Sequence, residues 1–128
     1  METKSKSKVR KNLHDRLQSE CFRMLWNEYP ELRYLCFTTT NNLTTAIKGV
    51  EGAIRMNQLK AMGLVKGTTD LVFYYKGVLY GFDMKVGRDK LRKEQKEFIA
   101  AISKQGGTGC EIRSLQEFKD KIKEIVGR

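Results

Sequence analysis

The sequence predicts an α/β domain in which a mixed central sheet of about four strands is flanked by helices. Segments with helical periodicity alternate with short runs that are rich in aromatic and β-branched residues. The length of 128 residues suits one domain with a core of its own. Hydrophobic residues make up 40% of the chain and charged residues 31%, which is ordinary for a globular protein.

The first helix is expected from about residue 11 to Tyr29, because Pro30 follows and apolar residues recur along one face. These residues are Leu13, Leu17, Cys21 and Met24. Residues 1–11 are mostly polar and basic and offer nothing to bury, so we expect them to form a flexible arm. The domain itself is expected over residues 12–128.

The remaining elements are expected in the order strand, helix, strand, strand, helix, strand, helix. Their expected ranges are 33–40, 51–62, 71–75, 78–86, 91–105 and 108–113, followed by a helix capped by Ser114. Residues 41–49 are expected to form a loop. Lys76 and Gly77 are expected to form the turn of a hairpin between the strands 71–75 and 78–86.

The formal charge of +10 and the isoelectric point near 9.7 favour an anionic partner. Nucleic acid is the commonest such partner, and a membrane surface is the alternative. No apolar stretch approaches the length of a membrane span, and no apolar run follows the basic N-terminus as in a signal peptide. The three cysteines are odd in number and lack metal-finger spacing, so a reducing, cytoplasmic location is expected.

The predicted hairpin carries charged residues where a core strand should be apolar. Successive strand residues face opposite ways, so Asp83 and Lys85 share the face opposite Phe82 and Met84. Asp70 begins the preceding strand, and a short turn returns the chain beside it. For Asp83 and Lys85 alone, a solvated surface ion pair would be the ordinary interpretation.

Two of the expected helices also carry a polar side chain on a face that should be apolar. Glu20 lies between Leu17 and Met24 on the apolar stripe of the first helix, and Gln95 lies between apolar residues of the helix 91–105. Both side chains are therefore expected to face the interior. His14, the only histidine, is expected on the helix surface, and the sequence supports no histidine-based catalysis.

Clustered carboxylates beside a lysine favour one kind of chemistry. Carboxylates at close range repel each other and hold a hard divalent cation such as Mg²⁺, which also binds substrate phosphate. A cation lowers the pKa of a bound water, and a lysine can orient that water or stabilise phosphate oxygens. The sequence therefore predicts a metal site for phosphodiester hydrolysis.

The segment GLVKGTTDLVFYYKGVLYGFDMKVGRDKLRKEQKEF resembles the VRR-NUC nucleases of the PD-(D/E)xK superfamily. The shared features are a glycine-rich turn, an Asp before a hairpin, an acid-x-Lys on its second strand and a helix with an early Gln. With Glu20 included, the resemblance extends from residue 12 to about residue 118. The chain departs from the family in having Asp83 where Glu is commoner and Thr69 where Pro is commoner.

The resemblance implies a restriction-endonuclease-like core and a role for each matched residue. Asp70, Asp83, the backbone carbonyl of Met84 and Glu20 would hold Mg²⁺ or Mn²⁺. Lys85 would act on the attacking water, and Gln95 would steady Lys85 or the phosphate. A basic cluster follows the second strand of the hairpin and could contact DNA phosphates or simply be solvated: Arg88, Lys90, Arg92 and Lys93.

The expected activity is metal-dependent endonucleolytic cleavage of DNA, selective for nicked, flapped or branched substrates. Two alternatives stay open. One is a catalytically silent nucleic-acid-binding module on the same fold. The other is a homodimer that resembles the Holliday-junction resolvases, in which the second copy helps to position the DNA.

Overall fold

The structure is a computed structural model that describes residues 2–39 and 49–128, with side chains from residue 8 onward. Most of the expected loop 41–49 lies outside the described residues. The elements are α1 (Glu2–Glu28), the 3-10 helix η1 (Pro30–Leu32), β1 (Cys36–Thr38), α2 (Gly49–Ala61), β2 (Leu71–Tyr75), β3 (Val78–Met84), α3 (Lys93–Lys104), β4 (Thr108–Ile112) and α4 (Leu115–Val126).

The four strands form one mixed sheet in the order β1-β2-β3-β4. The first three strands are antiparallel neighbours, and β4 pairs with β3 in parallel. Parallel pairing requires a crossover, which α3 provides. Lys76 and Gly77 connect β2 and β3 with φ angles of 46° and 82°, as a two-residue primed turn requires. The predicted mixed sheet and hairpin are confirmed.

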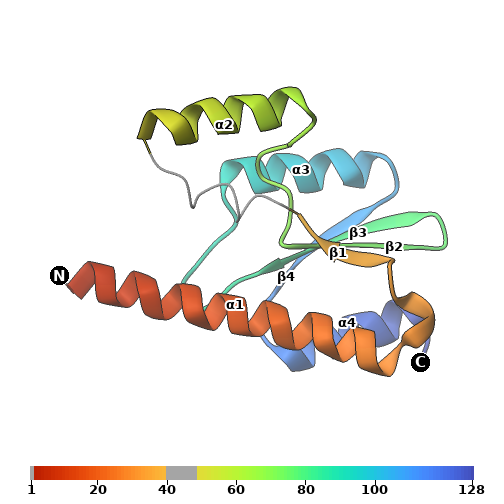
Figure 1. The fold of residues 1–128 in the computed structure, drawn as a ribbon. Coiled ribbons are helices and arrows are strands. Elements are labelled where there is room, and N and C mark those ends of the chain that lie inside the picture. Colours follow the sequence, from red (N-terminus) through yellow and green to blue (C-terminus); the bar gives the residue numbers. More distant parts are fainter. Residues whose placement is uncertain (1, 40–48) are drawn as a thin grey trace.

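Helices cover both faces of the sheet, with α1 and α4 on one face and α3 on the other (Figure 1). The main core lies on the α1 and α4 face. It joins Leu17, Cys21, Met24 and Leu25 of α1 to Phe118 and Ile122 of α4 and to the inward side chains of the sheet, among them Phe73, Phe82, Met84 and Ile112. The expected alternation along β3 is therefore correct, because Phe82 and Met84 both belong to this core.

Glycines on the other face allow α3 to lie close to the sheet. Gly81 of β3 and Gly109 of β4 are register partners. A Cβ at Gly109 would lie 2.5 Å from Cγ1 of Ile99, so no side chain fits there. This close approach brings the first turn of α3 next to the end of β3, where Asp83 and Lys85 lie.

The first helix begins at Glu2, earlier than the expected start near residue 11. The expectation of an arm rested on the lack of apolar residues, but the segment also lacks Gly and Pro and is rich in Lys, which favours helix. At the other end of the chain the expected cap is confirmed, because the hydroxyl of Ser114 accepts a hydrogen bond from the Glu117 amide at 3.1 Å.

The three cysteines are free, and Cys21 and Cys36 are buried in the core. Burial raises the pKa of both thiols to about 12, so they serve as small apolar side chains. Among the described residues, no helix combines the length and the apolar character that crossing a membrane requires.

Candidate active site

Asp83, Lys85 and Gln95 form a buried polar cluster between β3 and α3. Asp83 is fully buried, and Lys85 and Gln95 are 6% and 8% exposed. Nζ of Lys85 lies 2.8 Å from Oδ2 of Asp83 and donates to Oε1 of Gln95 at 3.1 Å. Gln95 in turn donates from Nε2 to Oδ1 of Asp83 at 3.3 Å. The sequence predicted that these three residues lie together, and the structure brings them together.

The position of Gln95 follows from its place in the first turn of α3. Its Oε1 also accepts a hydrogen bond from the backbone amide of Arg92 at 2.9 Å. A Gln at this helix position commonly reaches back to the amide that precedes the helix. The side chain therefore has a structural reason to be held in place, and its free donor is directed at Asp83.

Asp70 lies in the turn before β2, and two nitrogen atoms lie within hydrogen-bond distance of its Oδ2. The Met84 amide donates to this oxygen at 2.7 Å, and Nε2 of His14 lies 2.9 Å from it. The preceding Thr69 is fully buried, and its hydroxyl donates to the Leu71 carbonyl at 2.9 Å. This hydrogen bond fixes the turn that presents Asp70, at the position where the VRR-NUC pattern commonly has Pro.

The two carboxylates have opposite electrostatic environments. Burial raises the pKa of Asp83, the neighbouring Asp70 raises it further, and the result is a pKa of about 6 despite the opposing effect of Lys85. Burial also acts to raise the pKa of Asp70, but His14 and the Met84 amide outweigh it, so this pKa lies below its usual value. The hydrogen bond to Asp70 raises the pKa of His14 against the effect of burial.

One buried oxygen in this cluster lacks a hydrogen bond. Oδ2 of Asp83 is close to the Lys85 ammonium, but no hydrogen bond of good geometry reaches it. A buried carboxylate oxygen that repels a neighbouring carboxylate fits a site for a hard cation. In the part of the chain that the structure describes, however, no three His, Cys, Asp or Glu side chains are grouped closely enough to hold a metal ion as they stand.

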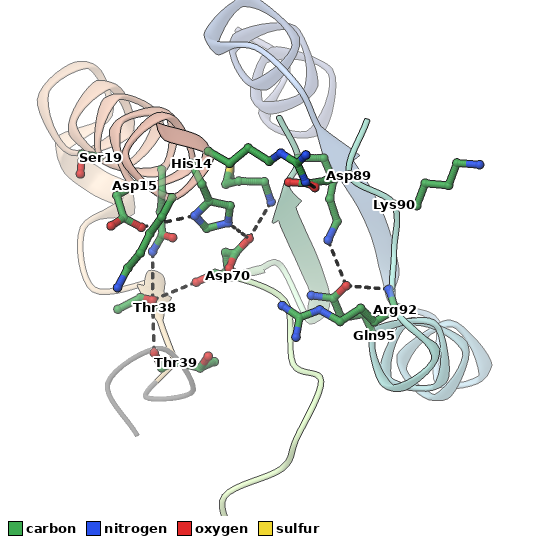
Figure 2. Close-up of a pocket in the computed structure, with 15 residues that line it drawn as sticks. His14, Asp15, Ser19, Thr38, Thr39, Asp70, Asp89, Lys90, Arg92 and Gln95 are labelled. Carbon is green, nitrogen blue, oxygen red and sulfur yellow. Dashed lines mark hydrogen bonds and ion pairs between the residues drawn. The ribbon is translucent and has the colours of Figure 1, made fainter. Parts of the chain in front are cut away.

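An open cavity of about 840 Å³ leads to this cluster and lies between α1 and the start of α3 (Figure 2). Asp70, Met84, Lys85 and Gln95 line it, whereas the buried Asp83 lies beneath its surface. Basic residues line both sides of the opening: Arg10 and Lys11 from α1, and Lys90 and Arg92 from the segment before α3. A phosphate group that entered the cavity would therefore meet positive charge at the rim and Lys85 at the floor.

The predicted basic cluster is divided by the structure. Lys90 and Arg92 line the cavity, although the Lys90 side chain points outward in Figure 2. Arg88 and Lys93 are exposed and do not line it. Sequence reasoning did not identify Arg10 and Lys11, because it assigned both to an arm outside the domain.

Glu20 does not lie where the sequence pattern placed it. Its carboxylate accepts a hydrogen bond from Nε of Arg16 at 3.1 Å on the outer side of α1, and it does not line the cavity. At about 100° per residue, Glu20 lies at the edge of the stripe that Leu17, Cys21 and Leu25 define. The face of α1 that packs against the core is centred on Cys21 and Leu25, and Glu20 therefore lies beside solvent.

His14 is the residue that sequence reasoning missed. We expected it on the surface, yet its ring is partly buried and lies in the cavity against Asp70 (Figure 2). The signal was present, because His14 precedes Leu17 by three residues and Cys21 by seven and so shares their helix face. Sequence reasoning started the apolar stripe at Leu13 and so placed His14 off the buried face. Leu13 is in fact 48% exposed and does not belong to that face.

The mixed sheet, its flanking helices and the Asp70, Asp83 and Lys85 hairpin define an α/β domain of the restriction-endonuclease type. A solved structure described as a "VRR_NUC domain protein" is similar to this chain with a TM-score of 0.65. The similarity covers 87% of this chain and 85% of that chain at 17% sequence identity. It agrees with the VRR-NUC resemblance in the sequence and establishes the fold. No protein-family model and no curated protein sequence matches the chain.

Proposed function

We propose that this protein is a divalent-metal-dependent nuclease that hydrolyses phosphodiester bonds of DNA. The observation that carries the proposal is the buried Asp83 carboxylate, which has an oxygen without a hydrogen bond and lies beside Lys85. In a purely structural role, that buried oxygen would remain without a hydrogen bond, at a cost in stability. A binding module would gain nothing from carboxylates at a surface that faces polyanionic DNA.

Asp70, Asp83 and the backbone carbonyl of Met84 are the groups that would hold Mg²⁺ or Mn²⁺. When bound, the cation supplies positive charge near the scissile phosphate and lowers the pKa of a bound water. The ammonium of Lys85 lies 2.8 Å from Asp83 and can donate to the attacking water or to a phosphate oxygen. Gln95 positions Lys85, because it accepts one of the ammonium hydrogen bonds.

The rim explains how DNA would be retained. Arg10, Lys11, Lys90 and Arg92 lie on opposite sides of the cavity, and the whole chain carries a formal charge of +10. Such contacts position the backbone of DNA without reading its sequence. Selectivity for nicked, flapped or branched DNA rests on the VRR-NUC resemblance.

A cleavage assay tests this proposal. Supercoiled plasmid and a panel of linear, nicked, flapped and branched DNAs would be incubated with the protein and Mg²⁺ or Mn²⁺. We expect cleavage with a metal, no cleavage in EDTA, and faster cleavage of at least one interrupted or branched substrate than of plain duplex. DNA binding without cleavage under any metal would overturn the proposal and favour the silent binding module.

Homodimerisation is a separate part of the proposal. Its support is α2 and the segment after it, which expose apolar side chains at Val50, Ile54, Met62 and Val65. Sedimentation equilibrium of the full chain would measure it. We expect a dimer at micromolar concentration that Ile54→Glu dissociates, and a wild-type monomer throughout would contradict it.

A further inference from the structure

His14 is held between two carboxylates, one on each ring nitrogen. Nε2 lies 2.9 Å from Oδ2 of Asp70, and Nδ1 lies 3.4 Å from Oδ1 of Asp15, the next residue along α1 (Figure 2). A neutral imidazole has one N–H and one lone pair. One of the two carboxylates would therefore face a lone pair, unless a second proton or a cation lies on that side.

The position of Asp15 decides which nitrogen is suited to a cation. A histidine that binds a metal usually donates its other ring N–H to a carboxylate, which fixes the ring and its tautomer. In the tautomer that carries its proton on Nδ1, that N–H is directed at Asp15 and the lone pair of Nε2 lies inside the cavity beside Asp70. Asp15 thus stands to His14 as the carboxylate does that commonly orients a metal-binding histidine.

The separation of the two donor atoms is also suitable. Two ligand atoms at right angles around a cation, each about 2.1 Å from it, lie about 3.0 Å apart. Nε2 of His14 and Oδ2 of Asp70 are 2.9 Å apart. Both atoms can therefore bind one cation as adjacent ligands, once the ring turns so that the Nε2 lone pair faces the cation and not Asp70.

We propose that Nε2 of His14 is a ligand of the divalent cation, next to Asp70, and that Asp15 orients the ring. This inference rests on the proposed metal site and supplies the donor from α1 that Glu20 does not provide. It also sets the metal preference. Imidazole suits transition metals better than Mg²⁺, so the site should favour Mn²⁺ over Mg²⁺.

The chain offers an unambiguous test, because His14 is its only histidine. Tag-free full-length protein would be loaded with Mn²⁺, and ¹⁴N couplings to the ion would be measured by pulsed EPR. Any imidazole coupling must arise from His14. We expect such a coupling in the wild-type protein and in Glu20→Gln, and its loss in His14→Gln, where Mn²⁺ affinity measured by calorimetry should fall about tenfold or more.

His14→Glu is the second variant, because it keeps an oxygen ligand at the same place. It should lose the coupling, keep binding a divalent cation and shift its preference toward Mg²⁺. Asp15→Asn should keep the coupling but bind Mn²⁺ more weakly. Bound Mn²⁺ without imidazole coupling in the wild-type protein would overturn the inference, as would equal affinities of wild type and His14→Gln.

The outcomes separate this inference from the proposed nuclease activity. DNA cleavage with bound Mn²⁺ but no imidazole coupling would overturn the His14 ligand and support the nuclease. Imidazole coupling without cleavage of any DNA would support the ligand and overturn the nuclease. Absence of Mn²⁺ binding would overturn both.

Discussion

His14 and Asp70 are 56 residues apart in the chain, and their side chains meet at 2.9 Å across the cavity. This contact ties α1 to the turn before β2. In the absence of metal it is an ion pair that depends on the charge of both groups, so it makes the stability of the protein depend on pH.

The pH range over which this pair stabilises the protein follows from the two pKa shifts. The pKa of Asp70 is lowered from 3.8, so its contribution is present above that pH and is lost as the pH falls through the lowered value. The pKa of His14 is raised from 6.5, so its contribution is full below that pH and is lost as the pH rises through the raised value.

We therefore expect His14→Gln to lower the melting temperature most between pH 4 and 6.5, by about 4 °C for a loss of about 1 kcal/mol. The difference from wild type should shrink toward pH 9. Thermal unfolding in EDTA across this range measures it. A difference that does not change with pH would mean that the ring contributes only packing.

Asp83→Asn should abolish cleavage and leave the fold intact. The amide keeps the shape of the carboxylate but removes the charge that would hold the cation. The raised pKa of Asp83, about 6, means that wild type loses stability as the pH rises from about 4 to 6, and the variant should lose less. Asp120→Asn on α4 is the matched control. Wild-type cleavage rates in Asp83→Asn would remove Asp83 from the site.

Glu20→Gln should change neither melting nor cleavage measurably. Its partner Arg16 is on the same exposed side of α1, and an exposed pair of this spacing contributes about 0.3–0.5 kcal/mol. The measurements are thermal unfolding and cleavage across a Mn²⁺ titration, with His14→Gln alongside. A fall in metal affinity for Glu20→Gln would show that Glu20 reaches the cation after all.

Gln95→Met should destabilise the protein and slow cleavage. The substitution leaves a Lys85 proton, an Asp83 oxygen and the Arg92 amide without this partner, and we expect a loss of about 2 kcal/mol. Urea unfolding measures the loss, and Gln116→Met on the exposed side of α4 controls for the change of residue type. Equal stability of the two variants would show that water replaces the Gln95 contacts.

Binding to DNA should weaken steeply with salt. About six phosphate contacts would give a slope near −5 in a plot of log affinity against log salt concentration. Arg92→Gln should reduce the slope by about one, whereas Lys123→Gln on α4 should not change it, although both remove one charge. Fluorescence anisotropy in Ca²⁺ or EDTA would measure binding without cleavage. Equal slopes for both variants would place DNA elsewhere on the surface.

The hairpin half of the site could be predicted because local rules determine it. A two-residue turn fixes the register of β2 and β3, and alternation along β3 then assigns Asp83 and Lys85 to one face and Phe82 to the other. Gln95 was found for a similar reason, since the stripe of α3 has a single well-defined apolar side. These inferences needed no knowledge of how distant elements pack.

The α1 half could not be predicted in the same way. The rotation of α1 about its axis is set by its packing against α4 and the sheet, and side chains at the edge of an apolar stripe can then face either way. Glu20 and His14 lie near opposite edges of the stripe. The rotation that buries Cys21 and Leu25 leaves Glu20 beside solvent and places His14 in the cavity. Only the assembled structure decides between them.

The two halves of the site should also differ in how often they open. β3 has a hydrogen-bonded neighbour on each side, and its residues 81–84 are buried, so the amides of these residues should exchange with solvent only when the whole domain unfolds. Residues 8–13 of α1 are exposed and should exchange much sooner. His14 lies at the boundary between a slowly and a rapidly opening part of the chain, so the start of α1 can unwind and expose the cavity while the strand that carries Asp83 stays folded.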